Sequence, residues 1–263
     1  MKYYEDHSDI KQNTEHGVLL FKNNNFIVNN KIVKNNRAII GDIVGTIDNK
    51  IINIIHRCSE KITGILQINS KIKYGKNKRG LSIYQFNPSK NGYPKFKVAC
   101  KHTGKKNIFC TIEFAKWEVN MKIPCGNIIK IIGEIGDVYN EYEHILNLCN
   151  LCKPKIKIHK LKDKIRKDCV INDKLQNEKI NKKVYTIDPR GSKDFDDALS
   201  FKKIENKYIV EVHITDITKI IDDELFNIAL ERINTIYMPH KIINMLPDIY
   251  SENILSLKEN TNK

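Results

Sequence analysis

The sequence predicts a mainly β chain of the α+β class, in which small β-barrels in tandem precede a shorter α+β segment. From Gly17 to about Leu148, short apolar runs alternate with turn-forming residues, and this pattern is typical of strands. A charged stretch, 153–183, interrupts the pattern. Further apolar strands and one helix-period run follow it. Many short strands at regular spacing favour a small barrel or a sandwich.

The first predicted domain covers residues 16–60 and follows a tail, 1–15, that we expect to be poorly ordered. Asn-rich breaks at 23–25, 29–30 and 35–36 suit turns, because Asn tolerates left-handed backbone angles. The strands predicted between and after these breaks are 17–21, 26–28, 31–33, 37–40, 43–47 and 51–55.

The second predicted domain covers residues 61–152, and its clearest strands are 62–68, 96–99, 108–114 and 128–132. Basic residues lie between the strands, and we expect five of them to contact RNA: Lys95, Lys97, Lys101, Lys105 and Lys106. Aromatic residues are interleaved with them, namely Tyr74, Tyr84, Phe86, Tyr93 and Phe96. Cations with stacking rings are typical of a groove for a single nucleic-acid strand. The alternative, aromatic side chains that fill a barrel core, is equally compatible with the sequence.

The formal net charge of +14 and the pI of about 9.3 indicate a surface that attracts polyanions. A coding bias toward Asn, Ile and Lys also produces such a composition. No run of about 18 apolar residues exists, so we expect no membrane span. The seven cysteines show no framework spacing, which favours reduced thiols and a cytoplasmic or nuclear location.

The charged stretch, 153–183, is interpreted as a linker, and residues 184–263 as the last domain. Within that domain, 222–234 is predicted to be a helix with Asp222 as its N-cap. The apolar spacing predicts that one face of this helix carries Phe226, Ala229, Leu230 and Ile233.

Four carboxylates fall within ten residues of this domain: Asp188, Asp194, Asp196 and Asp197. Such a cluster repels itself unless a cation compensates, and oxygen donors suit Mg²⁺ or Mn²⁺. The turn-forming residues 189–191 can bring the chain back toward Asp188. Two metal ions held by carboxylates are typical of phosphodiester cleavage. The alternative is a solvated acidic loop; the flanking apolar strands and the basic chain favour the metal site.

The segment from Thr186 to Ala198 reads Thr-Ile-Asp-Pro-x-x-x-x-Asp-Phe-Asp-Asp-Ala. It resembles the signature that opens the RNB domain of ribonuclease II, ribonuclease R and the Dis3-type exonuclease of the exosome. Further matches follow in the family's order at 212–217, 237–239, 244–247 and 255–257. Upstream, 36–42 resembles the first cold-shock-like domain of Dis3-type members, and 93–96 and 132–137 resemble the second. The resemblance therefore implies tandem OB-fold, cold-shock-like barrels followed by the first part of an RNB domain.

The resemblance also implies function. Its members are Mg²⁺-dependent 3′→5′ exoribonucleases that hydrolyse single-stranded RNA to 5′-nucleotides. The four aspartates match the magnesium ligands, Asp196 matches the acid most critical for catalysis, and Tyr237 matches a tyrosine that stacks on RNA. A core tyrosine is the alternative for Tyr237. His213, on a strand beside the acids, is expected to pack or to form hydrogen bonds rather than to bind metal.

The family's RNB domain continues for several hundred residues beyond the matched motifs, whereas this sequence ends soon after Leu257. We therefore expect weak or absent activity from this chain alone. The implied partners are single-stranded RNA and either a separately encoded C-terminal RNB half or an exosome-like complex. The alternative function is a non-catalytic RNA-binding module or a subunit of such an assembly.

Overall fold

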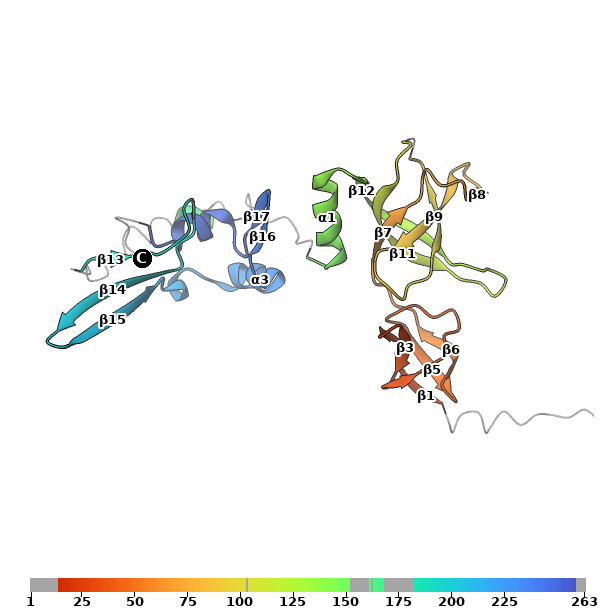
Figure 1. Ribbon diagram of the computed structural model, residues 1–263, viewed down its shortest axis with the longest axis horizontal. Coiled ribbons are helices and arrows are strands. Elements are labelled where there is room, and N and C mark those ends of the chain that lie inside the picture. The colour runs from red at the N-terminus through yellow and green to blue at the C-terminus, as the bar shows by residue number, and fades with distance from the viewer. Residues whose placement is uncertain (1–13, 103, 152–160, 162, 168–181, 259–263) are drawn as a thin grey trace, which may run out of the picture. The chain divides into compact units, whose positions relative to one another are not determined.

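The computed structural model describes residues 14–102, 104–151, 161, 163–167 and 182–258 (Figure 1). The chain divides into two compact units, residues 1–152 and 153–263. Nearly all of the predicted tail, 1–15, and most of the predicted linker, 153–183, lie outside the described residues. Among the described residues, no helix is long and apolar enough to cross a membrane.

The first part of unit 1 is a small barrel built from two three-stranded antiparallel sheets. Its strands are β1 (Glu15–Val18), β2 (Leu20–Lys22), β3 (Asn25–Val28), β4 (Lys31–Ile32), β5 (Ile43–Ile47) and β6 (Lys50–His56). The sheets have the orders β1-β5-β6 and β2-β3-β4. They join at Leu19, between β1 and β2, and at the bridge between Lys34 and Lys50. Leu19 is fully buried in the core that the two sheets enclose.

The turns of this barrel confirm the role predicted for asparagine. Asn23, Asn24, Asn29 and Asn30 all adopt positive φ, the left-handed region that Asn tolerates better than most residues. The strand predicted at 37–40 is wrong. These residues form a turn in which the buried carboxylate of Asp42 accepts a hydrogen bond from the backbone N–H of Ile39 at 2.8 Å. The carboxylate of Asp42 thus supplies a hydrogen bond that a neighbouring strand would otherwise supply.

The second part of unit 1 is a closed barrel. Its strands are β7 (Ile62–Leu66), β8 (Lys73–Lys76), β9 (Ser82–Pro88), β10 (Phe96–Cys100), β11 (Ile108–Lys116) and β12 (Cys125–Glu134). Pairings in the order β7-β9-β10-β12-β11 return to β7, and β8 extends the sheet beside β9. The pair β10–β12 is parallel, with Lys97 opposite Cys125. This ring of five strands is the Greek-key arrangement of an OB-fold.

A helix, α1 (Val138–Leu148), follows the closed barrel inside a stretch that the sequence analysis treated as β-rich, so that assignment is wrong there. Asp137 caps the helix by accepting from the N–H groups of Tyr139 and Asn140. On the helix, His144 stacks on the ring of Phe109 with a centroid separation of 4.0 Å. Burial lowers the pKa of His144 below its ordinary value.

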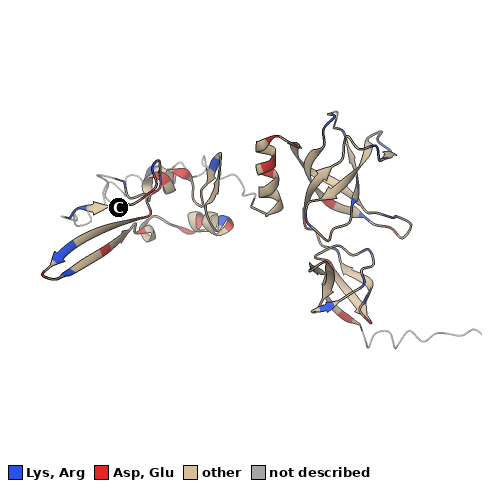
Figure 2. Cartoon of the chain, viewed as in Figure 1, with Lys and Arg blue, Asp and Glu red and all other residues tan. Residues whose placement is uncertain are grey.

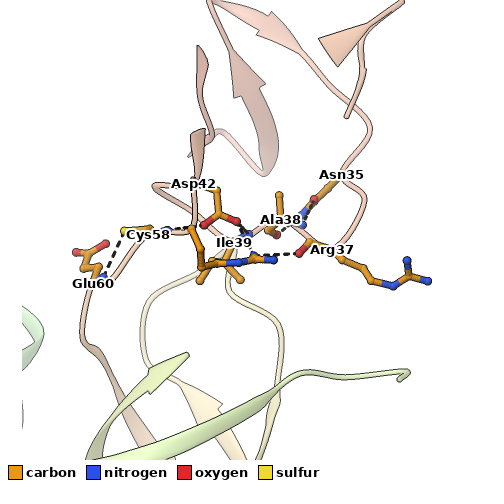
Figure 3. Close-up of polar contacts among 8 residues, drawn as sticks. Asn35, Arg37, Ala38, Ile39, Asp42, Cys58 and Glu60 are labelled. Atoms are coloured by element: carbon orange, nitrogen blue, oxygen red, sulfur yellow. Dashed lines mark hydrogen bonds and ion pairs between the residues drawn. The ribbon is translucent and has the colours of Figure 1, made fainter. Parts of the chain in front are cut away.

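The two barrels of unit 1 contact each other around Arg57, close to the residues drawn in Figure 3. Its guanidinium donates to the fully buried carboxylate of Asp42 at 2.6 Å and lies 4.3 Å from the ring centroid of Phe114, on β11. Arg37 donates to the carbonyl of Val119, between β11 and β12. One cationic side chain thus serves the polar network of one barrel and the aromatic surface of the other.

Unit 2 contains a three-stranded antiparallel sheet, a helix and a small hairpin. The strands are β13 (Val184–Tyr185), β14 (Asp197–Ile204) and β15 (Lys207–Ile214), and the hairpin is β16 (Ile236–Met238) with β17 (Lys241–Ile243). The helix is α3 (Asp223–Arg232), and short turns η3 (Ile217–Lys219) and η4 (Tyr250–Ile254) lie on either side of it in the sequence. Leu225, Tyr250 and Ile254 form the centre of the core. Leu161 and Ile165, from the predicted linker, pack there too.

The N-cap predicted for α3 is confirmed, because the carboxylate of Asp222 accepts from the N–H of Leu225 at 3.0 Å. The residues predicted to share one apolar face of this helix do not together form its buried face. Phe226, Leu230 and Ile233 are each more than half exposed. A neighbouring stripe, formed by Leu225, Ile228, Ala229 and Arg232, faces the core instead. The helix carries two apolar stripes, and its spacing alone does not say which one the core covers.

One face of the three-stranded sheet is apolar and open to solvent. The register places Phe201 opposite Val210, and Val212 opposite Leu199, so these side chains share a face. The exposed members of this apolar face, each more than half accessible, are Tyr185, Phe201, Tyr208, Val210, Val212 and Ile214.

Candidate functional site

The four aspartates lie on a loop that connects β13 to β14. Asp188 follows β13, and the chain then turns over residues 189–192, where the hydroxyl of Ser192 donates to the carbonyl of Pro189 at 2.9 Å. Gly191 takes φ +93°, which a side chain would strain. Asp197 is the first residue of β14. The turn predicted between Asp188 and Asp194 is therefore present.

Asp194 is the half-buried member of this loop, whereas Asp188, Asp196 and Asp197 are exposed. Burial, together with the negative charges of Asp196, Glu252 and Asp188, raises the pKa of Asp194 to about 6. Lys258 opposes this effect. Three of the four predicted carboxylates therefore share one electrostatic field.

The loop side chains do not form a closed ligand set. Across the ranges that the structure describes, no group of three or more His, Cys, Asp or Glu side chains is close enough to hold a metal ion. The donor chemistry nevertheless fits a hard divalent cation, since every predicted ligand is a carboxylate and a cation would relieve the repulsion that raises the pKa of Asp194. The residues thus fit Mg²⁺ in type and in charge.

Glu252 is a functional candidate that the sequence analysis missed. It lies on η4, near Asp194, and its carboxylate forms an ion pair with Lys193 at 3.8 Å. Asn244 also donates to it, at 3.5 Å. More than fifty positions separate Glu252 from the acidic loop, so no local spacing links them. Its place between the matched segments 244–247 and 255–257 was the available signal.

The acidic loop is anchored to the chain around residue 256. The N–H of Phe195 donates to the hydroxyl of Ser256 at 3.0 Å, and the N–H of Leu257 donates to the carbonyl of Phe195 at 2.9 Å. The Ser256 hydroxyl also donates to the carbonyl of Lys193 at 3.3 Å. Ser256 itself is fully buried.

His213, on β15, forms the hydrogen bond that was expected of it. Its Nε2 lies 2.9 Å from the hydroxyl of Ser200, on β14, and that hydroxyl donates to Glu211 at 2.8 Å. Lys182 pairs with the same carboxylate. The hydrogen bonds from Lys182 and Ser200 lower the pKa of Glu211. The network joins β14 to β15 directly after the acidic loop.

Tyr237 lies on the β16–β17 hairpin, opposite Ile242. Its side chain is 76% exposed, so the alternative of a core tyrosine does not describe it. An exposed ring on a short hairpin is accessible to a nucleotide base.

The basic residues of the closed barrel occupy its strands and loops (Figure 2). Lys97, on β10, lies over the ring of Tyr74 at 5.0 Å from the centroid. Lys106 pairs with Glu134 at 3.5 Å. The remaining predicted cations, Lys95, Lys101 and Lys105, are exposed.

The structure distinguishes the two alternatives for the aromatic residues, stacking on bases and packing in the barrel core. Tyr84, Phe86 and Phe96 are buried in the barrel core and are not available to stack on bases. Tyr93 packs against that core and donates a hydrogen bond to Glu60, and burial raises its pKa. Tyr74 is partly exposed and lies beside Lys97, so of these five aromatic residues it fits the predicted pairing of a stacking ring with a cation.

Two regions of the chain match known protein families. Residues 176–263 match the RNB domain family, and residues 83–150 match the Dis3-like cold-shock domain 2. The chain therefore contains one segment similar to each of these two families. The RNB match includes all four aspartates, Glu252 and Ser256.

Individual relatives align over about a third of this chain. Ribonuclease R of Chlamydia muridarum is 43% identical over 82 residues, which are 30% of this chain and 12% of that protein. DIS3-like exonuclease 2 of Schizosaccharomyces pombe is 38% identical over 86 residues, 32% of this chain and 9% of that protein. The matched segment is therefore a small part of each relative.

The fold of this chain is found in solved structures. The apo form of Mycoplasma genitalium RNase R has a TM-score of 0.72 at 18% identity, covering 93% of this chain and 42% of that one. Yeast Ssd1, described as a pseudonuclease, has a TM-score of 0.56 at 15% identity, covering 97% of this chain and 41% of that one. Because a nuclease and a pseudonuclease share it, the fold alone does not decide activity.

Proposed function

We propose that this chain forms part of a Mg²⁺-dependent 3′→5′ exoribonuclease that hydrolyses single-stranded RNA to 5′-nucleotides. The observation that carries the proposal is the grouping of Asp188, Asp194 and Asp196 in one electrostatic field, on a loop anchored within the RNB-matched segment. Clustered carboxylates destabilise a fold unless a cation or a substrate compensates for them. The cluster is therefore better explained by function than by stability.

In this proposal Asp188, Asp194, Asp196 and Asp197 hold Mg²⁺ or Mn²⁺. The bound ion would orient a water nucleophile and stabilise the leaving oxygen of the phosphodiester. Asp196, exposed on the loop, is the residue proposed to contact the reacting groups. Glu252 adds negative charge beside Asp194 and pairs with Lys193, which limits the repulsion within the loop.

The RNA-contacting residues proposed here lie in both units. Tyr237 presents an exposed ring for stacking near the 3′ end of the RNA. The exposed face of the closed barrel offers Lys97 beside Tyr74, and Lys95, Lys101, Lys105 and Lys106 add positive charge. In OB-folds, the surface of the second and third barrel strands is the usual face for oligonucleotides, and here these are β9 and β10. Among the structural relatives, Mycoplasma genitalium RNase R has been solved with ribose-methylated single-stranded RNA and with double-stranded RNA.

A second candidate function is a non-catalytic RNA-binding module or a subunit of an exosome-like assembly. Two observations favour it: the described residues do not form a closed metal-ligand set, and the fold is shared with a pseudonuclease. The chain covers 42% of the RNase R structure that it resembles. In this candidate function, the proposed partners are a separately encoded C-terminal RNB half or an exosome-like complex.

The deciding experiment incubates 5′-labelled single-stranded RNA with the chain and Mg²⁺, and compares wild type with Asp196→Asn. Asp223→Asn, an exposed acid on α3, is the matched control. Catalysis predicts a ladder of shortened RNA with wild type and with the control, and its loss with Asp196→Asn or with EDTA. Equal RNA binding by all three proteins without any product would reject the nuclease and favour the binding module.

A further inference from the structure

The loop that carries Asp194 and Asp196 is held by one serine from a distant part of the chain. Ser256 is 61 residues away from Phe195, fully buried, and bonded to the loop at both its donor and its acceptor position. A hydroxyl has one proton to donate, and here Ser256 donates it to the carbonyl of Lys193 while accepting from the N–H of Phe195.

These bonds fix three consecutive peptide groups. The carbonyl of Lys193 belongs to the first, the N–H of Phe195 to the second and the carbonyl of Phe195, bonded to Leu257, to the third. The Cα of Asp194 lies between the first and second groups, so both of its backbone dihedral angles are constrained. The Cα of Asp196 follows the third group directly.

The serine is itself held in place. The hydroxyl of Thr215, after β15, donates to the carbonyl of Leu255 at 2.5 Å. Ile254, two positions before Ser256, is buried in the core of unit 2. These two anchored residues, both directly before Ser256, let the hydroxyl transmit the position of the core to the loop.

We propose that Ser256 is a positioning residue, whose hydroxyl holds the backbone of 193–195 so that Asp194 and Asp196 are presented together to a divalent cation. The inference rests on the proposed function in one respect, the cation. Ser256 does not contact the cation or RNA in this proposal. It acts through the acids that it positions.

The test uses the full chain with Ser256→Ala, which removes both hydrogen bonds, and Ser256→Thr, which keeps the hydroxyl. Ser251→Ala is the matched control, since Ser251 has no side-chain hydrogen bond in the described structure. Leu225→Ala, from the core of the same unit, is the control for a general loss of stability. The readouts are amide hydrogen exchange at Phe195 and Mn²⁺ binding followed by electron paramagnetic resonance.

The expected result is roughly tenfold faster exchange of the Phe195 amide in Ser256→Ala, because its hydrogen bond is lost. The dissociation constant for Mn²⁺ should rise roughly tenfold or more. Ser256→Thr should restore both quantities, and Ser251→Ala should change neither. Leu225→Ala should lower the melting temperature without this selective effect at Phe195.

Unchanged exchange at Phe195 in Ser256→Ala would overturn the inference, as would Mn²⁺ binding equal to that of wild type. An effect of Leu225→Ala equal to that of Ser256→Ala would also overturn it, because Ser256 would then be merely structural. If wild type binds no Mn²⁺, the metal site of the proposed function is rejected. A selective exchange effect at Phe195 would still support the serine's hold on the loop.

Discussion

The carboxylate of Asp42 lies 2.6 Å from Nη1 of Arg57, and the carboxylate is fully buried while the guanidinium remains partly exposed. Asp42 also accepts from the N–H groups of Ile39 and Cys58, each at 2.8 Å. The buried charge is therefore compensated by one cation and two backbone dipoles. This arrangement explains why a stretch that reads as a strand, 37–40, folds instead as a turn around Asp42.

Removal of the cation should destabilise unit 1. We expect Arg57→Met to lower its free energy of unfolding by about 3 kcal/mol, because Asp42 would keep a buried charge without its partner. Urea unfolding followed by Trp117 fluorescence and by far-ultraviolet circular dichroism measures the change. Arg79→Met, on an exposed turn, is the control. If the two variants unfold alike, Arg57 does not stabilise the pair as described.

Asp194→Asn should stabilise unit 2 in the absence of divalent cations. The pKa of Asp194 is raised to about 6, so the folded state binds its proton more tightly than the unfolded state does. The resulting stability is present below pH 3.8 and is lost as the pH rises through about 6. At pH 7.5 we expect a gain of about 1 kcal/mol, less than the full shift implies because solvent screens the partly exposed group.

Differential scanning calorimetry from pH 4 to pH 8 measures this prediction in EDTA, with Asp223→Asn as the control. The gain should shrink as the pH falls toward 4. A variant that is less stable than wild type at pH 7.5 would contradict the account of the acidic loop.

Unit 1 should lose stability in acid through His144. Its pKa is lowered by burial against Phe109, so the unfolded state binds a proton more readily than the folded state does. Stability is therefore full above pH 6.5 and falls as the pH drops through the folded-state pKa. His144→Gln should flatten this dependence, measured by urea unfolding between pH 7.5 and pH 5. His240→Gln, in the other unit, should leave it unchanged.

Ile233→Gly should stabilise unit 2, although glycine usually weakens a fold. Ile233 ends α3 with φ +67°, a region that a β-branched residue adopts only under strain, and its side chain is 75% exposed. We expect a gain of about 0.5–1 kcal/mol by calorimetry. Leu230→Gly, within the same helix and also exposed, should instead cost about 1 kcal/mol. Changes of the same sign in both variants would contradict the strain at Ile233.

RNA binding should depend steeply on salt, because lysines that neutralise phosphates release counterions. We expect Lys97→Ala to weaken binding and to reduce the slope of log K against log salt by about 1. Fluorescence anisotropy with a labelled single-stranded RNA measures both. Lys116→Ala is the control, since Lys116 is already paired with Glu118 at 2.7 Å. A slope that stays flat in wild type would argue against phosphate-led binding.

Local signals predicted much of the fold. The asparagine turns, the Asp222 cap and most strand positions depend on residues within a few places of one another. The errors occurred where tertiary contacts decide. The α3 helix has two apolar stripes, and only the core shows that Leu225 rather than Phe226 is buried.

The candidate site, too, was predictable only where its residues lie close together in the sequence. The acidic loop was visible as a motif, because its carboxylates lie close together in the sequence. Glu252 and Ser256 were not assigned roles, since each meets the loop only after the chain has folded back over more than fifty residues. Tyr84, Phe86 and Phe96 alternate with outward-facing residues on their strands, and the sequence did not reveal which side faced the barrel interior.

The open apolar face of the β13–β14–β15 sheet also affects how the chain behaves in concentrated solution. Tyr208, Val210 and Val212 lie on β15, an outer strand of this sheet, which pairs along only one side within the described residues. An exposed apolar strand at the edge of a sheet can pair with a strand of another molecule, and so promotes aggregation. Sulfate, which strengthens hydrophobic association, should bring the chain out of solution sooner than chloride does at matched ionic strength.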